Sequence, residues 1–229
     1  MNRNILTLII LTLCFAQVKA QRKINIPLKH ELDSLYILDQ KYRAMMSVKL
    51  DSAKIDSIKK SLNLNEGDFF SQINKIANKT DSSNVKRVEE IIAQYGYPGS
   101  SLVDTPTNQA AFFVLQHSTV IDKYLPVIEK AAKDKELPFR LYAMMKDRSL
   151  MYNKKEQIWG TQLKGMTVIN PETKKPQFKF FVWPISDPKN VNKRRKQAGF
   201  EQTAEENAKR LGVDYKVYTL QQALKGQVD

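Results

Sequence analysis

The chain has 229 residues, 42% of them hydrophobic, and its 37 lysine and arginine residues outnumber its 24 acidic residues, giving a formal net charge of +13. This length suits one domain with a substantial core. The only cysteine, Cys14, lies in an N-terminal segment that we expect to be removed, which excludes disulfides, thiolate metal sites and a cysteine nucleophile from the remaining chain.

Residues 1–20 have the pattern of a secretory signal peptide. Arg3 precedes a largely apolar run at 5–15, and residues 18–20 put small side chains at the minus-three and minus-one places of a cleavage site. The apolar run is shorter than the roughly 20 residues that a permanent transmembrane helix needs. We therefore expect cleavage before Gln21 and export, either to a periplasm or to the medium.

A lipid anchor at Cys14 is not expected. A lipoprotein signal also ends in a cysteine, but Leu13 stands before Cys14 where a small residue is required.

The sequence after the signal peptide forms one unit. It has no second transmembrane-like segment, no internal repeat and no flexible linker. The sequence thus predicts a single domain over residues 21–229.

The basic charge has two explanations. It suggests an acidic partner, such as a membrane surface, an anionic glycan or nucleic acid. It is explained equally well by solvated lysines, because the charges are spread along the chain. The densest cluster, Lys189 with residues 193–196, is short and has no interleaved aromatic residues, so we do not expect nucleic-acid binding.

Apolar residues three and four positions apart predict about six helices before residue 155. The expected helices cover residues 28–45, 55–62 and 85–95, and others begin near Pro106, Val120 and Glu136. Gly96 and Pro98 stop the third of them. The segment 63–83 is ambiguous, because its apolar residues form a helical stripe but the polar run at 80–84 indicates a break.

The last third of the chain changes from helical to alternating periodicity. The alternation predicts three short strands in an antiparallel meander, at residues 157–163, 166–169 and 177–183. The Asp187–Pro188 pair predicts a helix start, Gly199 its stop, and Thr203 with Glu206 a capping box for a last short helix. The predicted fold class is mainly α (α+β), with about six to eight helices and a small β-meander near 157–183.

The chain has two histidines, and any imidazole chemistry must use them. His30 has no second histidine four residues later, so the zinc-protease motif is absent and His30 is interpreted as a surface or capping residue. His117 follows Phe113 and Val114 at helical spacing, which turns its ring toward the buried side. It is either a structural histidine with a satisfied ring or an acid–base group.

Two other stretches carry polar residues of interest. Asp147 and Arg148 lie toward the end of an amphipathic helix, where Arg148 suits a carboxylate or phosphate but equally suits an internal salt bridge. Between Gln157 and Gln162, Gly160 interrupts a predicted strand. A glycine there marks either the close approach of a ligand or a bulge at the domain edge.

These stretches together resemble a bacterial family of unassigned activity, the domain of unknown function 6624 family, over roughly residues 36–200. The order and spacing of several motifs match: Tyr95-Gly96-Tyr97-Pro98-Gly99 with Ser101-Leu102-Val103, Gln116-His117 with Lys123-Tyr124-Leu125-Pro126, Asp147-Arg148, Gln157 with Gly160-Thr161-Gln162, Pro184-Ile185, Asp187-Pro188, Val191 and Arg194-Arg195. Three positions depart from the family pattern: Trp159 replaces the usual tyrosine, Ser186 a common acid and Asn192 the usual aspartate.

The resemblance implies a helical domain and no established reaction. It also implies that a set of polar side chains meets in one pocket: His117, Asp147, Arg148, Gln157, Thr161 and Gln162. A site that depended on a tyrosine hydroxyl at position 159 would be lost in this chain.

The first functional hypothesis is a binding or interaction module whose pocket recognises a polar or anionic ligand. Its ligand-binding residues would be Arg148, Gln157, Thr161, Gln162 and Trp159, with help from His117. This hypothesis is favoured because the sequence has no nucleophile elbow, phosphate-binding glycine loop, metal-ligand cluster or paired carboxylates. We accordingly expect no metal ion and no cofactor.

The alternative hypothesis is a metal-independent hydrolase or transferase. His117 would be its general base, Asp147 would orient the ring, and Arg148 with Gln162 would stabilise an oxyanion. Thr161 is the only obvious hydroxyl nucleophile. Both hypotheses require His117 to lie within hydrogen-bonding reach of Asp147 or Gln162 in a concave pocket.

Overall fold

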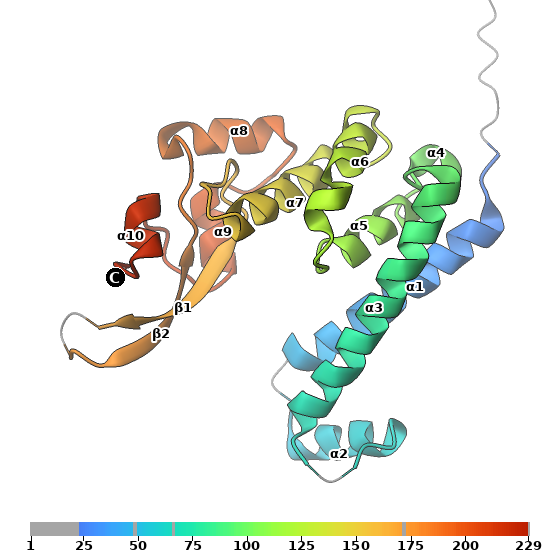
Figure 1. Cartoon of the computed structure of the whole chain (residues 1–229), viewed down its shortest axis with the longest axis horizontal. Helices are drawn as coiled ribbons and strands as arrows, with labels where there is room; N and C mark the ends of the chain where they lie inside the picture. The colour runs from blue at the N-terminus through green and yellow to red at the C-terminus, as the bar shows by residue number, and fades with distance from the viewer. Residues whose placement is uncertain (1–22, 48–49, 66, 171–172, 229) are drawn as a thin grey trace, which may run out of the picture.

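The computed structural model describes residues 23–47, 50–65, 67–170 and 173–228, so the predicted signal peptide lies outside the described residues. The described ranges form ten α-helices, two 3₁₀ helices and one two-stranded antiparallel sheet (Figure 1). The predicted class, mainly helical with a small antiparallel β element, is confirmed, although the described helices are more numerous than the six to eight predicted. No helix in these ranges combines the length and the apolar character needed to cross a bilayer.

Two long helices form one end of the molecule. α1 (Ile26–Ser47) packs along α3 (Phe69–Tyr95), and α2 (Ser52–Ser61) lies near the end of α1 and the start of α3 (Figure 1). Leu32 of α1 and Ile91 of α3 are 0% exposed. Burial of these apolar stripes stabilises the pair, because each large aliphatic side chain removed from water contributes about 1.5–3 kcal/mol.

The predicted break at residues 80–84 is wrong, because this run lies inside α3. Asn84 is buried, and its side-chain amide donates to the backbone carbonyl of Leu35 on α1 at 3.3 Å. Asparagine is disfavoured in helix interiors, because its side-chain amide can form hydrogen bonds with nearby backbone groups that compete with those of the helix. Here the neighbouring helix supplies the partner, so the helix continues.

Four helices follow in the middle of the chain and complete the largest hydrophobic core with α1 and α3. They are α4 (Ser100–Val103), α5 (Ala110–Leu115), α6 (Ile121–Lys133) and α7 (Phe139–Tyr152), with a 3₁₀ turn at Thr107–Gln109 before α5. Phe112, Leu115 and Ile128 are among their fully buried side chains. This core fixes α7, the helix that carries Asp147 and Arg148.

The two glycines of the Tyr95–Gly99 motif stand where a side chain would strain the backbone or collide with a neighbour. Gly96 ends α3 with φ 73°, a left-handed conformation that favours glycine. A Cβ at Gly99 would lie 2.4 Å from the Cβ of Glu136, and the Glu136 carboxylate accepts a 2.7 Å hydrogen bond from the Ser101 N–H. This part of the family motif therefore anchors α4 to the loop between α6 and α7.

The β element is a hairpin of β1 (Leu163–Ile169) and β2 (Pro176–Val182), paired from Leu163 with Val182 to Ile169 with Pro176. The predicted meander is wrong in its first strand. Residues 157–162 form a loop, with one isolated bridge between Gln157 and Ile185. The cause is a set of side chains that bind the loop's backbone, described below.

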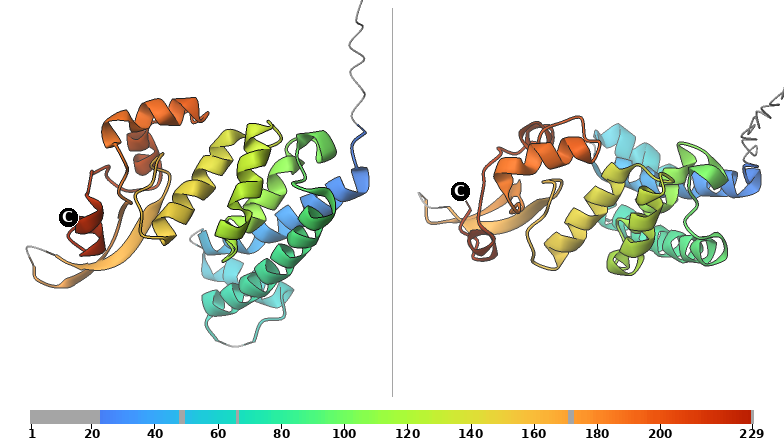
Figure 2. Two further views of the ribbon diagram at one scale, coloured as in Figure 1. Left: turned by 45° about the horizontal axis from the view of Figure 1, so that its top comes forward. Right: turned by 90° about the horizontal axis from the view of Figure 1, so that it is seen from above.

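The C-terminal helices gather around the base of the hairpin, at the opposite end of the molecule from α1 and α3 (Figure 2). They are α8 (Val191–Gln197), preceded by the 3₁₀ turn Pro188–Asn190, α9 (Ala204–Arg210) and α10 (Leu220–Leu224). The predicted capping box of Thr203 and Glu206 is confirmed at the start of α9. One face of the hairpin is buried by the segment around α10, through Val168 and Phe181.

Candidate functional site

Asp147 organises the 157–162 loop. It lies on α7 with 0% of its surface exposed, and its carboxylate accepts hydrogen bonds from the backbone N–H groups of three loop residues and from one hydroxyl. The donors are Ile158 N at 2.7 Å, Trp159 N at 3.1 Å, Thr161 N at 3.1 Å and Thr161 Oγ1 at 3.0 Å. Because these N–H groups point at α7, they are not available to a strand ladder.

Gln157 closes the loop from within. Its side chain is 0% exposed, donating to the carbonyls of Gln162 at 3.1 Å and Trp183 at 2.6 Å and accepting from the Gln162 N–H at 2.8 Å. All of these bonds go to the protein's own backbone. Gln157 therefore holds the loop shut, and the amide predicted to bind a ligand is already occupied.

Side chains from α8 and α9 hold the loop's carbonyl groups. Arg194 donates to the Ile158 carbonyl at 3.0 Å, and Arg195 donates to the Trp159 carbonyl at 2.8 Å. Gly160 has φ 66°, and a Cβ there would lie 2.8 Å from a methyl carbon of Ile185. Of the two interpretations of Gly160, the geometry supports a tight backbone turn against a neighbour.

The Asp147 carboxyl group has two opposing influences on its proton affinity. Burial raises its pKa, and the hydrogen bonds from Ile158, Trp159 and Thr161 stabilise the anion and lower the pKa, so that the net value is about 6. Four donors converge on one carboxylate. The group is thus committed to the loop, and among the described residues it makes no hydrogen bond with His117.

His117 instead contacts Arg148. It lies just beyond α5 and is exposed, contrary to the predicted inward orientation, because α5 ends at Leu115 before the helical stripe reaches it. Arg148 Nη1 lies 3.3 Å from His117 Nδ1 and donates to the Gln116 carbonyl at 2.8 Å. Since arginine only donates, Nδ1 must accept, and the neutral ring carries its proton on Nε2.

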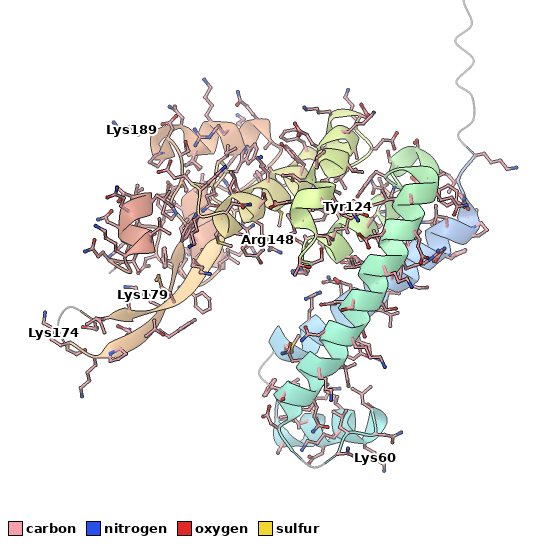
Figure 3. All side chains as sticks on the ribbon, viewed as in Figure 1. Lys60, Tyr124, Arg148, Lys174, Lys179 and Lys189 are labelled. Carbon is pink, nitrogen blue, oxygen red and sulfur yellow. The ribbon has the colours of Figure 1, made fainter. Side chains whose placement is uncertain are left out.

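The predicted polar residues form one connected network rather than a ring around a ligand. From His117 the contacts run through Arg148 to Gln162, whose Oε1 accepts from Arg148 Nε at 3.0 Å, and then to Thr161 Oγ1 at 3.0 Å and Asp147. Figure 3 shows Arg148 on α7 beside the middle helices. Asp147 and Gln162 thus reach His117 only through intervening side chains.

Trp159 lies apart from this network. Its ring contacts Phe139 and Tyr142 edge-on, with ring centres 6.3 Å from each. Its backbone N–H binds Asp147, and its ring serves as an aromatic contact to α7. The described residues include no group of three His, Cys, Asp or Glu side chains able to hold a metal ion.

We expect the His117 ring to remain neutral down to about pH 4. Crowding by neighbouring atoms removes water from part of the ring and, with the positive charges of Arg43 and Arg148, lowers its pKa to about 4 from 6.5. Protonation then opposes folding, so stability is lost as the pH falls from 6.5 through 4. NMR titration of the ring should give the low value, and Arg148→Gln should raise it. A titration near 6.5 in the unaltered protein would contradict this arrangement.

A cleft of about 500 Å³ opens on the other side of the 157–162 loop. Its walls come from α7, the loop, and the segment from α8 to α9. The lining includes Arg140, Thr161, Arg195, Phe200, Asn207 and Arg210. We call this the arginine cleft. Thr161 is the only one of the predicted site residues that lines it.

The arginines of the cleft have neutral partners. Arg195 is 2% exposed and donates to the carbonyls of Gln202 and Trp159, both at 2.8 Å. Arg210 donates to Gln202 Oε1 at 3.2 Å and Asn207 Oδ1 at 2.9 Å. No carboxylate of the described residues lies within 4.0 Å of the nitrogens of Arg140, Arg195 or Arg210.

Three residues of the cleft have no signal in the sequence: Arg140 on α7, and Asn207 and Arg210 on α9. The only signal for Arg195 was its place in the basic cluster and in the family motif Arg194-Arg195. No curated protein matches the chain, and no solved structure matches it. The family model of DUF6624 matches residues 65–220. This match begins and ends later than the predicted resemblance over roughly residues 36–200, and α1 lies outside it. The chain therefore belongs to DUF6624, a family of unknown function.

Proposed function

We propose that this protein is a binding module that takes a small anionic ligand in the arginine cleft. The observation that carries the proposal is Arg195, a cation that is 2% exposed, lines a cleft and has no acid within ion-pair distance among the described residues. A buried positive charge that has neutral hydrogen-bond acceptors but no acidic partner is costly. A bound carboxylate or phosphate would supply that partner through paired, charge-assisted hydrogen bonds.

The charge of the cleft lining favours an anion. Arg140, Arg195 and Arg210 stand against one acidic lining residue, Glu201. Asp147, Glu205 and Glu206 attract the Arg195 charge from beyond contact distance and so compensate it only in part. An anion bound directly by all three guanidinium groups would compensate the part of the positive charge that these distant carboxylates leave uncompensated.

The cleft is also preorganised. Neutral acceptors fix the guanidinium planes of Arg195 and Arg210, and Phe200 lies over Arg195 with its ring centre 4.6 Å from Cζ. Because these side chains are already held, a ligand would order few of them. A volume of about 500 Å³ falls within the usual range for small-molecule sites.

The second candidate is the hydrolase or transferase. It is favoured by Thr161, whose hydroxyl lies 3.0 Å from the buried Asp147 carboxylate at the cleft wall. His117 suits this role poorly, because its accepting nitrogen is turned to Arg148 and its other nitrogen carries the proton. Recognition without bond cleavage needs none of these groups to exchange a proton.

The test is calorimetric titration of the full chain with pyrophosphate and with citrate at low and physiological salt. We expect a single binding event for at least one of them, weakened by salt. Arg140→Gln and Arg210→Gln should each lower the affinity by about tenfold or more, because a hydrogen bond to a charged group contributes about 1.5–3 kcal/mol. Release of phosphate from pyrophosphate would favour the hydrolase instead.

Two further variants make the test specific. Arg87→Gln is the matched control, since Arg87 is an exposed arginine of α3 that pairs with Glu31 and Glu90, and it should bind as the parent does. Arg148→Gln examines the polar network. Loss of binding in Arg148→Gln with full binding in Arg210→Gln would move the ligand to His117 and Arg148 and overturn the cleft proposal.

Export is a separate proposal, supported by the charge, apolar run and small residues of the first 20 positions. It would put the cleft outside the cytoplasm, where the ligand would be a small anionic compound of that compartment.

A further inference from the structure

The hairpin has one apolar face that the described residues leave uncovered. In the strand register Gly165 pairs with Phe180, Thr167 with Phe178 and Ile169 with Pro176, so these side chains share a face. Ile169 is 60% exposed, Phe178 61% and Phe180 56%. Isolated exposed apolar residues are common on proteins, but three large ones together on one hairpin mark an interaction surface.

The two phenylalanines form a fixed pair. Their rings meet edge-on with centres 5.1 Å apart, above Gly165. A Cβ at Gly165 would lie 2.7 Å from both rings, so the absence of a side chain there lets the rings lie close to the strand. The two rings therefore form one exposed aromatic surface held close to the strands.

The opposite face holds the hairpin in place. Val168 is 5% exposed and Phe181 2%, and they pack with Tyr218 and Ala223 of the C-terminal segment. The hairpin extends outward from the helices around its base, with the far ends of β1 and β2 outermost (Figures 1 and 2). The exposed apolar face thus belongs to a hairpin whose other face is packed on the C-terminal segment.

Lysines lie at the tip of the hairpin and on its other face. Lys174 and Lys175 lie at the tip, and Lys164 and Lys179 alternate with the exposed apolar residues along the strands and so belong to the face of Val168 and Phe181. Figure 3 labels Lys174 and Lys179. None of the four is within 4.0 Å of a carboxylate of the described residues, and the turn's one acid, Glu172, lies outside them. The described part of the hairpin therefore carries four positive charges and no negative one.

We propose that the hairpin docks on an anionic lipid surface, with Phe178, Phe180 and Ile169 in the interface and the tip lysines at the headgroups. Aromatic rings suit the boundary between headgroups and acyl chains, and lysines there are attracted to anionic lipids. A second copy of the chain is a poorer occupant, because a symmetric contact would add the tip lysines of both copies to one interface, where the described part of the hairpin offers no acid to pair with them. The helices themselves stay outside the bilayer.

The test is flotation of the full chain with two kinds of vesicle, phosphatidylcholine alone and phosphatidylcholine with phosphatidylglycerol in equal parts. We expect binding to the anionic vesicles only. Phe178→Ser with Phe180→Ser should lower partitioning by about tenfold or more from the lost apolar contact. Lys174→Gln with Lys175→Gln should lower it by roughly 25-fold, since each lysine near the surface contributes about fivefold.

The matched control carries the same changes at the other end of the molecule. Phe70 of α3 is 46% exposed, and Lys54 and Lys60 of α2 are exposed, so Phe70→Ser with Lys54→Gln and Lys60→Gln should float like the parent. Because every variant keeps residues 1–20, any lipid binding by that segment is common to all. A local readout is Phe178→Trp, whose emission should shift to shorter wavelength with anionic vesicles.

Three outcomes would overturn the proposal. One is equal binding to neutral and anionic vesicles by the parent chain. Another is anionic binding that survives the paired phenylalanine substitutions. The third is a dimer of the parent chain that Phe178→Ser with Phe180→Ser dissociates while vesicles bind neither protein, which would assign the face to a second copy.

Discussion

Replacing Asp147 by alanine is expected to lower the free energy of unfolding by about 4 kcal/mol. The substitution leaves three backbone N–H groups of the 157–162 loop without their acceptor, and each buried unsatisfied group costs about 1–3 kcal/mol. Chemical denaturation followed by circular dichroism measures the change. Asp134→Ala is the control, because Asp134 is an exposed residue beside α6, and it should cost under about 1 kcal/mol. A loss for Asp147→Ala as small as the control's would contradict its role.

Replacing Gln157 by leucine is expected to cost about 3 kcal/mol. The leucine is similar in size but leaves the Gln162 N–H and the carbonyls of Gln162 and Trp183 without their side-chain partner. The measurement is again denaturation, with Gln221→Leu on the exposed surface of α10 as control. Where the variant remains folded, its affinity for pyrophosphate should match the parent's. A loss of affinity at unchanged stability would return Gln157 to the ligand site.

The elements predicted best are those whose patterns are local. The apolar stripes of α1 and the second half of α3, the capping box at Thr203 and the alternation in β2 each depend on residues a few positions apart. The 157–162 segment has the same alternation, yet it is a loop. Its backbone is bound by Asp147 from α7 and by arginines from α8, and those contacts do not follow from its own residues.

The same distinction applies to the site. The family resemblance placed six residues in one pocket: His117, Asp147, Arg148, Gln157, Thr161 and Gln162. The side chains of all but Gln157 form one hydrogen-bonded network, and of the six only Thr161 lines the arginine cleft. Their roles could not be predicted, because an aspartate looks the same in the sequence whether its carboxylate binds the backbone of a loop or orients a histidine ring. The arginine cleft needed the tertiary arrangement of α7 and α9, whose arginines are far apart along the chain.

The network and the cleft meet at the 157–162 loop. Asp147 and Gln157 hold the loop from one side, and Arg195 holds its Trp159 carbonyl while lining the cleft. The loop thus joins the network to the cleft through Thr161 and Arg195, although neither Asp147 nor Gln157 lines the cleft.

Anion binding in the arginine cleft can be followed by NMR of the arginine side-chain Nε–H groups while pyrophosphate is added to the full chain. We expect the signals of Arg195 and Arg210 to move together and saturate, while that of Arg148 stays in place. Saturable movement of the Arg148 signal alone, or no movement of any arginine signal, would contradict anion binding in the cleft.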